Sequence, residues 1–241
     1  ATTTSAPKEW TQIGNNIYGE AAGDRSGYSV SLSSDGTRVA VGALYNNANG
    51  IYSGHVRVYE LQDGSWTQIG GDIDGETEFD YSGYSVSLSS DGTIVAIGAY
   101  GNDGNGENSG HVRVYEYKMF TGENTYNYND RNQMGTSHPL IITGDNNPIP
   151  TPGKSYWTQM GTDIDGEIKS DFSGYSVSLS SDGNRVAVGA LYNNANGNNS
   201  GHVRVYELQG GVWRKAGNDI EGEAVGDQSG YSVSLSSDGT R

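Results

Sequence analysis

Hydrophobic and polar residues alternate at every second position along much of the chain, which predicts short β-strands. From Tyr28, hydrophobic residues alternate with serines up to residue 33, and valines alternate with small residues over 38–43 and with larger ones over 55–60. A period of two places successive side chains on opposite faces of a strand. The Asp63-Gly64 pair is a hairpin-turn signal and predicts a fourth strand over 66–70.

The predicted four-strand unit occurs more than once. The string YSVSLSSDG opens at residues 28, 84, 175 and 231, and tryptophans recur with the same spacings at 10, 66, 157 and 213. The spacing is 56 residues for the first and last pairs and 91 for the middle pair. One inserted loop, placed at 117–156, therefore interrupts a single repeat region that covers 1–241.

Such a unit matches one blade of a β-propeller, in which four antiparallel strands form a sheet that packs between neighbouring sheets. Each buried Val or Leu contributes on the order of 1.5 to 3 kcal/mol, which is too little per unit to offset chain entropy unless neighbours cover both faces. Small residues such as Ala40 and Gly42 would let a neighbouring sheet approach closely. The predicted fold is all-β, with three complete blades plus partial ones, as part of a larger or multi-chain propeller.

The segments 26–32, 39–43 and 54–59 together resemble the FG-GAP repeat of integrin alpha-subunit propellers and related surface proteins. The resemblance implies an extracellular or cell-surface protein whose blades close into a ring and make protein contacts. The family often carries an acidic calcium loop between its first and second strands, but here this place holds only Ser34-Asp35-Gly36-Thr37. Calcium needs six to eight oxygens, so the calcium residues of the family cannot be carried over.

Charge and composition restrict the partners. The net charge of −15 disfavours nucleic acid and anionic membranes, because both need a basic surface. The chain has no cysteine, which excludes disulfides and thiolate chemistry. No apolar run approaches the length that spans a bilayer, and 1–10 lacks a signal-peptide core, so the sequence is interpreted as a mature or excised segment.

Acidic loops recur once per repeat and are the candidate metal site. Strand direction alternates, so the loops that join fourth to first strands and second to third strands are expected on one rim. Carboxylates gathered there would suit calcium. The predicted calcium residues are Asp74, Glu76, Asp80, Asp165, Glu167 and Asp171. The alternative is ordinary turn chemistry, since exposed turns use the same residues, and Asp24 would then cap its own turn.

Four further features are candidates for structure or recognition. The inserted loop is rich in Tyr, Asn and Pro, so Tyr126, Tyr128 and His138 are predicted to contact a partner, unless the loop is only a surface tether. Asn198 opens a glycosylation sequon that would be used in a secreted eukaryotic protein. The repeated tryptophans are expected to be packing anchors, with stacking on sugar as the alternative. The repeated histidines at 55, 111 and 202 are expected to be structural and satisfied by a neighbouring loop.

The sequence favours binding over catalysis. We find no unrepeated Ser, His and Asp grouping, metal-ligand motif or phosphate-cradling loop, so an enzyme is not predicted. The predicted function is an extracellular or cell-surface structural and adhesive module that mediates protein contact or filament assembly. Its expected partners are copies of itself or other segments of a longer repeat chain. A glycan-binding propeller is the alternative, and a propeller-borne hydrolase or lyase that uses His138 is a third hypothesis.

Overall fold

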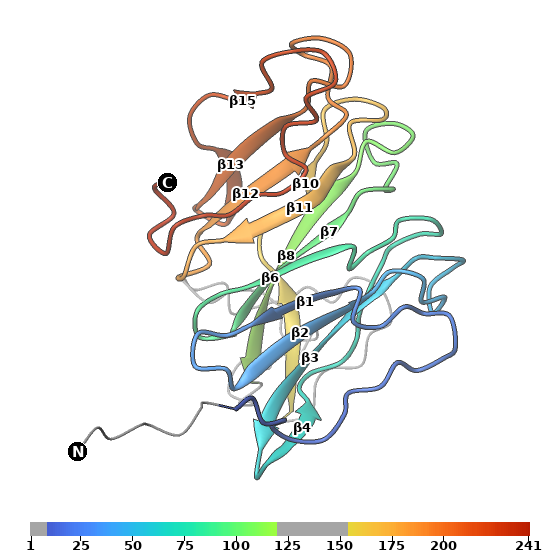
Figure 1. The fold of residues 1–241 in the computed structure, drawn as a ribbon, viewed down its shortest axis with the longest axis vertical. Helices are drawn as coiled ribbons and strands as arrows, with labels where there is room; N and C mark the ends of the chain where they lie inside the picture. The colour runs from blue at the N-terminus through green and yellow to red at the C-terminus, as the bar shows by residue number, and fades with distance from the viewer. Residues whose placement is uncertain (1–8, 120–153) are drawn as a thin grey trace, which may run out of the picture.

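The computed structural model describes residues 9–119 and 154–241, which form three β-sheets and no helix. The sheets follow one another along the long axis of the molecule in sequence order (Figure 1). The four main strands of each sheet pair antiparallel with their sequence neighbours. The predicted all-β fold of propeller blades is confirmed, and we call the sheets the first, second and third blades. No helix in the described ranges has the length and apolar character needed to span a bilayer.

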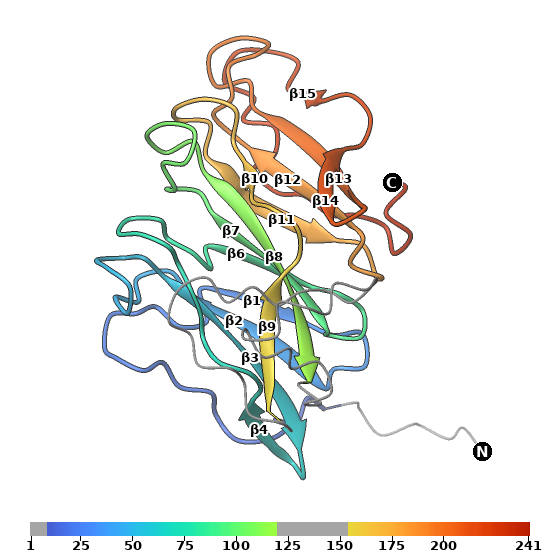
Figure 2. The ribbon, with the colours of Figure 1, turned by 180° about the vertical axis from the view of Figure 1, so that it is seen from behind.

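Each blade contains four main strands and one short strand. The first blade is β1 (Ser29–Leu32), β2 (Arg38–Ala43), β3 (His55–Gln62), β4 (Ser65–Gln68) and the short β5 (Ile73–Asp74). The second is β6 (Ser85–Leu88), β7 (Ile94–Ala99), β8 (His111–Met119), β9 (Ser155–Gln159) and β10 (Ile164–Asp165). The third is β11 (Ser173–Leu179), β12 (Arg185–Ala190), β13 (His202–Gln209), β14 (Val212–Lys215) and β15 (Ile220–Glu221). The reverse view shows the outer strands β4, β9 and β14 (Figure 2).

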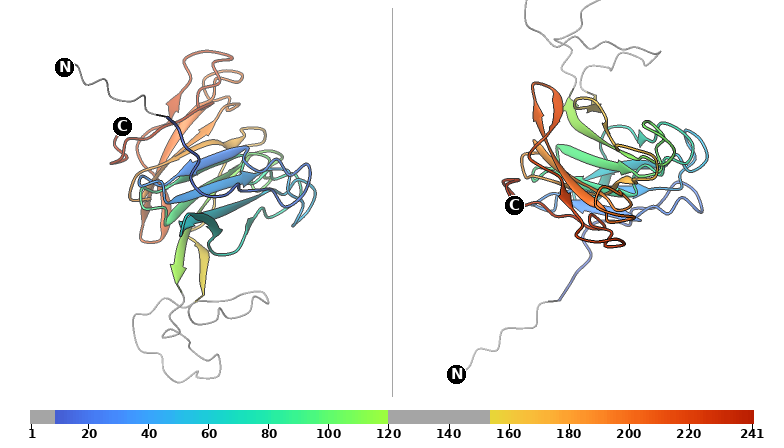
Figure 3. Two further views of the ribbon diagram at one scale, coloured as in Figure 1. Left: turned by 60° about the horizontal axis from the view of Figure 1, so that its bottom comes forward. Right: turned by 90° about the horizontal axis from the view of Figure 1, so that it is seen from above.

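The structure corrects two details of the predicted strands. The short strands β5, β10 and β15 were not predicted; each pairs with the start of the third strand of its blade. β8 and β9 pair as far as Met119 and Ser155, so the predicted boundaries of the inserted loop, 117–156, are too wide at both ends. This long hairpin projects from the body of the second blade (Figure 3).

Hydrophobic contacts between consecutive blades form the core. Val56 and Val58 on β3 are completely buried and pack with Leu88, Val95 and Ile97 of the second blade. The second and third blades repeat this contact through Val112, Val114, Val186 and Val188. The stability of each blade therefore depends on its neighbours, as expected from the small apolar content of one unit.

The serines of the first strand bind the next blade. Ser29 Oγ donates to the carbonyl of Gly83 at 2.6 Å, and Ser31 Oγ accepts from the amide of Leu88 at 2.9 Å. Gly42 on β2 lies so close to the second blade that a Cβ there would be 2.2 Å from the Gly83 oxygen. The predicted close approach at Gly42 is thus confirmed. The polar face of the first strand serves the contact between blades.

Candidate functional site

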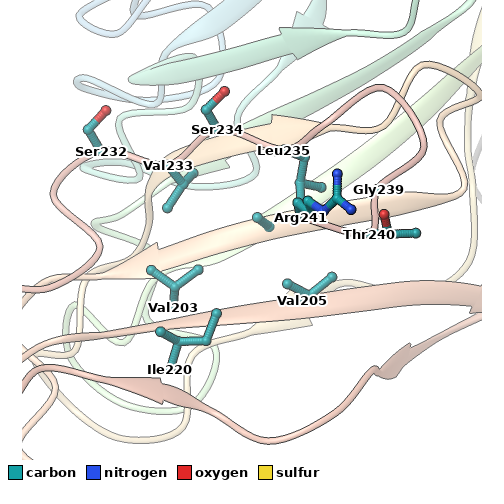
Figure 4. Close-up of a pocket in the computed structure, with 11 residues that line it drawn as sticks. Val203, Val205, Ile220, Ser232, Val233, Ser234, Leu235, Gly239, Thr240 and Arg241 are labelled. Carbon is teal, nitrogen blue, oxygen red and sulfur yellow. The ribbon is translucent and has the colours of Figure 1, made fainter.

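An apolar pocket of about 310 Å³ opens on the outer face of the third blade. Val203 and Val205 on β13 and Ile220 on β15 form one wall, and Val233 and Leu235 of the C-terminal segment face them (Figure 4). Ile220 is 58% exposed, whereas its equivalents Ile73 and Ile164 are 4% and 3% exposed. Residues that belong to the core between blades are therefore open to solvent here.

The contacts between the first and second blades and between the second and third blades show what packs against the face with Val203 and Val205. The counterparts of Val203 and Val205 in the first blade, Val56 and Val58, pack against Val95 and Ile97 of the next second strand, β7. The C-terminal segment already occupies the place of a next first strand, because Leu235 donates its amide to Ser178 Oγ at 3.0 Å. The pocket thus has the shape and composition that accept a second strand of the same repeat.

The opposite end of the stack exposes the matching face. Val30 and Leu32 on β1 are 63% and 60% exposed, whereas Leu88, the counterpart of Leu32, is 8% exposed against the first blade. Tyr28 at the start of this strand is also exposed. Both ends of the described stack therefore present surfaces whose internal copies are covered by another blade.

A buried histidine meets carboxylates once per repeat, on the loop rim. The side chain of His55 is 1% exposed, and its Nδ1 lies 3.9 Å from Glu20 Oε2, 4.0 Å from Asp72 Oδ2 and 3.9 Å from Asp74 Oδ1. Nδ1 of His111 lies 3.9 Å from both Glu76 Oε2 and Asp163 Oδ2. We call these groups the first and second His–acid clusters.

None of these histidine Nδ1 atoms has a hydrogen-bond partner among the described residues. This holds for His55, His111 and His202, and in His111 also for Nε2. The prediction that a neighbouring loop satisfies these histidines is therefore wrong for Nδ1, and all three side chains are buried. Burial lowers the pKa of the imidazole in all three, to about 4 in His111. At neutral pH the rings are uncharged, and each can present a lone pair.

In two acids of each cluster, a neighbouring side chain holds the other carboxylate oxygen. The Arg57 guanidinium lies 3.5 Å from Glu20 Oε1, and Gln68 Nε2 donates to Asp72 Oδ1 at 2.6 Å. In the second cluster, Arg113 lies 3.4 Å from Glu76 Oε1, and Gln159 donates to Asp163 Oδ1 at 2.5 Å. This pairing joins Arg57 and Arg113 to acids of the segment that leads into their own blade. It leaves one oxygen of each acid facing the histidine.

The third repeat departs from this pattern. Arg204 binds both carboxylate oxygens of Asp219, at 2.8 and 2.6 Å, and contacts Glu167 Oε1 at 2.5 Å. Lys215, which replaces the glutamine of the other repeats, lies 2.8 Å from Asp219 Oδ1. The hydrogen bond from Arg204 lowers the pKa of Asp219. His202 still meets Glu167 and Asp219 within 4.8 Å, but cations already hold both oxygens of Asp219.

The predicted calcium residues fall into different environments. Asp80 is 1% exposed, and its carboxylate accepts from the amides of Glu76 and Thr77 and from Asn102. Asp24 and Asp171 do the same in their repeats, each with an asparagine of the loop between second and third strands. These bonds confirm that the two loop sets meet on one rim. Turn chemistry thus engages Asp80 and Asp171.

The remaining predicted ligands divide between consecutive clusters. Asp74 faces His55, whereas Glu76, only two residues later, faces His111. Glu167 lies in the cluster of His202, and burial raises the pKa of Asp165 and Glu76. Asp74, Glu76 and Asp80 therefore do not face one common point, and calcium binding by this set stays a prediction.

A family model of repeat proteins matches the chain. The FG-GAP repeat model matches residues 19–59, 73–115 and 162–206, more than half of the sequence. The chain belongs to the FG-GAP repeat family. No curated protein matches it significantly.

Solved structures are similar to this FG-GAP chain only at low identity. A candidate 6-phosphogluconolactonase from Bacteroides uniformis has 14% identity and a TM-score of 0.45 over 80% of this chain and 39% of its own. Hydrazine synthase of Kuenenia stuttgartiensis has 12% identity and a TM-score of 0.44 over 92% of this chain and 42% of its own. The Chaetomium thermophilum protein Sqt1, bound to the N-terminus of a ribosomal protein, has 15% identity and a TM-score of 0.42 over 82% of this chain and 38% of its own. The chain spans about two fifths of the length of these proteins.

The tryptophans of the FG-GAP repeats link consecutive units. The indole N–H groups of Trp66, Trp157 and Trp213 donate to the carbonyls of Ile13, Ile69 and Met160, at 3.0, 3.1 and 2.7 Å. Each accepting residue follows the fourth-strand segment of the preceding repeat. These three tryptophans are therefore packing anchors, as expected from their repeat position. Trp10 is fully exposed.

Two rows of aromatic rings were not predicted. Tyr28, Tyr84, Tyr175 and Tyr231, one per repeat, lie with neighbouring ring centroids 4.7–5.3 Å apart. A second row continues along the blades through the residues Tyr45, Tyr81, Tyr100, Phe172 and Tyr192, with neighbouring centroids 5.1–5.9 Å apart. Burial raises the pKa of Tyr100 to about 12. The recurrence of tyrosine at one repeat position was the signal that could have predicted the first row.

The other predicted recognition residues have mixed outcomes. Tyr126, Tyr128 and His138 lie outside the described residues, so their partner contact stays a prediction. Asn198 is exposed, while Ser200 of the same sequon is buried and donates to the Asn193 carbonyl. An exposed acceptor is compatible with the predicted glycosylation, which also stays a prediction.

Proposed function

We propose that this FG-GAP chain is an extracellular or cell-surface structural and adhesive module that binds proteins and does not catalyse a reaction. The observation that supports it best is the open apolar pocket on the third blade, whose internal counterparts are filled by a neighbouring blade. The exposed face of β1 at the other end gives a second, complementary surface.

The occupant proposed for the pocket is a further unit of the same repeat, which supplies a second strand beside residues 231–235. The valines of that strand would enter between β13 and the C-terminal segment, as Val95 and Ile97 do on the first blade. This is strand addition to a sheet, in which backbone pairing gives affinity and alternate side chains give specificity. Successive contacts of this kind produce a ring or a filament.

A peptide tests this proposal directly. Residues 38–62 contain the second and third strands of the first repeat, so we expect this peptide to bind the immobilised chain. Val233→Asp places a charge in the pocket and should weaken binding at least about tenfold, since losing one buried Val costs about 1.5 kcal/mol or more. Val212→Asp, on the exposed β14, is the matched control and should bind normally.

Two results would contradict the proposal: a peptide that does not bind, or equal binding to the Val233→Asp and Val212→Asp variants. As a second control, the peptide with Val39 and Val41 replaced by serine should lose affinity, because these side chains would fill the pocket.

Glycan binding is the second candidate, and the aromatic rows favour it. Tyr52 and Phe79 are 38% and 45% exposed. The Tyr52 ring lies beside Tyr45 and Tyr81, and the Phe79 ring lies beside Tyr52. Flat exposed rings can stack on sugars. Retention on a glycan array that disappears in Tyr52→Ala and Phe79→Ala would support this function, and no retention by the unmodified chain would remove it.

A further inference from the structure

We propose that the first and second His–acid clusters each bind a divalent transition-metal ion such as Zn²⁺, through histidine Nδ1 and carboxylate oxygens. The ligands of the first are Glu20, His55, Asp72 and Asp74, and those of the second are Glu76, His111 and Asp163. This inference does not depend on the protein-binding function proposed above.

The unpartnered histidine is the observation that points to a ligand. His55 and His111 are 1% exposed, and their Nδ1 atoms face carboxylates at a distance too long for a hydrogen bond. A buried polar atom without a partner costs about 1–3 kcal/mol, so such an atom in a recurring position needs an explanation. In the first cluster Asp74 Oδ1 is also buried without a partner. A cation between these atoms would satisfy them together.

The distances suit a metal of this class. With metal–ligand bonds of about 2.1 Å, the ligand atoms of a tetrahedral site lie about 3.4 Å apart. The histidine nitrogens lie 3.9–4.0 Å from the carboxylate oxygens. The ligand atoms of Glu20, His55 and Asp72 lie within 4.8 Å of one another, and so do those of the second cluster. A contraction of about half an ångström at the nitrogen–oxygen pairs would complete the site. Imidazole together with carboxylate suits zinc and its neighbours, whereas calcium takes oxygen ligands only.

The surrounding side chains orient the ligands. Arg57 contacts one oxygen of Glu20, and Gln68 contacts one oxygen of Asp72. The other oxygen of each acid faces His55. Arg113 and Gln159 do the same around His111. Partners of this kind fix first-shell ligands in metalloproteins and influence their affinity. The chemistry of the repeat thus supplies both the ligands and their supports.

The third repeat is an internal contrast. Arg204 and Lys215 occupy both oxygens of Asp219, so this carboxylate offers no free oxygen to His202. We therefore expect one bound ion at each of the first two clusters and much weaker binding at the third. A bound ion would hold together three segments of a blade. In the first blade these are the segment before β1 with Glu20, the start of β3 with His55, and the connection before β5 with Asp72.

The test uses the full chain after removal of metals with a chelator. We expect equilibrium dialysis against zinc chloride, followed by elemental analysis, to find two zinc ions per chain. His55→Gln and His111→Gln should each remove one of them. His138→Gln, which changes the one histidine that does not recur at the repeat position, should remove none. Zinc should also raise the Tm of the unmodified chain, because it binds the folded state.

A second pair of variants separates binding from folding. Glu76 and Glu78 are both exposed and lie in the same connecting segment, but only Glu76 faces His111. Glu76→Gln should weaken zinc binding at the second cluster at least about tenfold, whereas Glu78→Gln should not change it. Cobalt in place of zinc should give visible absorption bands that disappear in the histidine variants.

Three results would overturn the proposal: no zinc retained by the unmodified chain, zinc retention that His55→Gln and His111→Gln leave unchanged, or displacement of the zinc by calcium at comparable concentration. The first would mean that no site exists, the second that surface carboxylates bind the metal, and the third that the site uses oxygen ligands alone.

Discussion

At the residue scale, glycine sets the distance between blades. Gly98 in the middle of β7 faces the carbonyl of Gly174 in the next blade, and a Cβ at this position would lie 2.0 Å from that oxygen and 2.3 Å from Ser85 Oγ. The nearest atom, the Gly174 oxygen, belongs to the backbone of the third blade and cannot move aside as a flexible side chain could. Gly42 and Gly189 hold the same position in their repeats. Even one methyl group would therefore separate neighbouring sheets.

Gly98→Ala should lower the free energy of unfolding by about 1–3 kcal/mol, the cost typical of an extra methyl group in a closely packed interior. Urea denaturation followed by tryptophan fluorescence measures it. Gly71→Ala is the control, because a Cβ there meets no atom within 4 Å and should leave stability nearly unchanged. Equal stability of the Gly98→Ala variant and the unmodified chain would contradict the packing described between the second and third blades.

At the scale of the element, one aspartate organises each turn between first and second strands. Asp35 accepts hydrogen bonds from the Ser33 hydroxyl at 2.7 Å and from the amide of Thr37 at 2.9 Å. The hydrogen bond from Ser33, followed by those from Thr37, lowers the pKa of the Asp35 carboxyl to about 2. The pKa values of the repeat copies Asp91, Asp182 and Asp238 are lowered as well. Asp35, the single carboxylate at the place where the family often has a calcium loop, therefore stabilises a hairpin turn.

This turn predicts a specific acid sensitivity. The pKa of Asp35 in the folded chain lies below that of an unfolded aspartate, about 3.9, so its stabilising effect is present above about pH 4. It is lost as the pH falls through about 2, when the folded carboxylate also becomes protonated. Asp35→Asn should thus reduce the dependence of the urea midpoint on pH between about 4 and 2. A variant whose pH profile matches that of the unmodified chain would refute this role.

The sequence predicted these elements well because repetition and alternation are local signals. Val39, Val41 and the glycine of the Asp35-Gly36 turn act within a few residues, so their strands and hairpin could be located directly. The serines of the first strand show the limit of this approach. Ser29 and Ser31 appear as one polar face in the sequence, yet they bind the next blade about 55 residues later, a contact that depends on how sheets stack.

The candidate site was less predictable for the same reason. The acids Asp74, Glu76 and Asp80 are close in sequence, but the backbone directs Asp74 to His55, Glu76 to His111 and Asp80 into its own loop. Local spacing cannot show that two neighbouring acids serve different blades. The repeated histidine was visible, but the missing partner of its Nδ1 could be recognised only from the packed structure.

At the scale of the whole molecule, consecutive repeats stack as neighbouring sheets. The three FG-GAP units share cores, serine hydrogen bonds and tryptophan contacts across each boundary. The same contacts, left open at the two ends, motivate the proposed protein binding. Stacking is therefore the claim that most needs a direct measurement.

Because the chain has no cysteine, a designed cross-link can report on stacking without background. The hydroxyls of Ser34 and Ser90, in the first and second blades, lie 2.8 Å apart, whereas Ser181 contacts Ser90 through its backbone. We predict that Ser34→Cys with Ser90→Cys forms an intramolecular disulfide under mild oxidation, detected by peptide mass spectrometry. The control pair Ser34→Cys with Ser181→Cys should stay reduced. Equal cross-linking of both pairs, or of neither, would contradict the stacking of consecutive repeats.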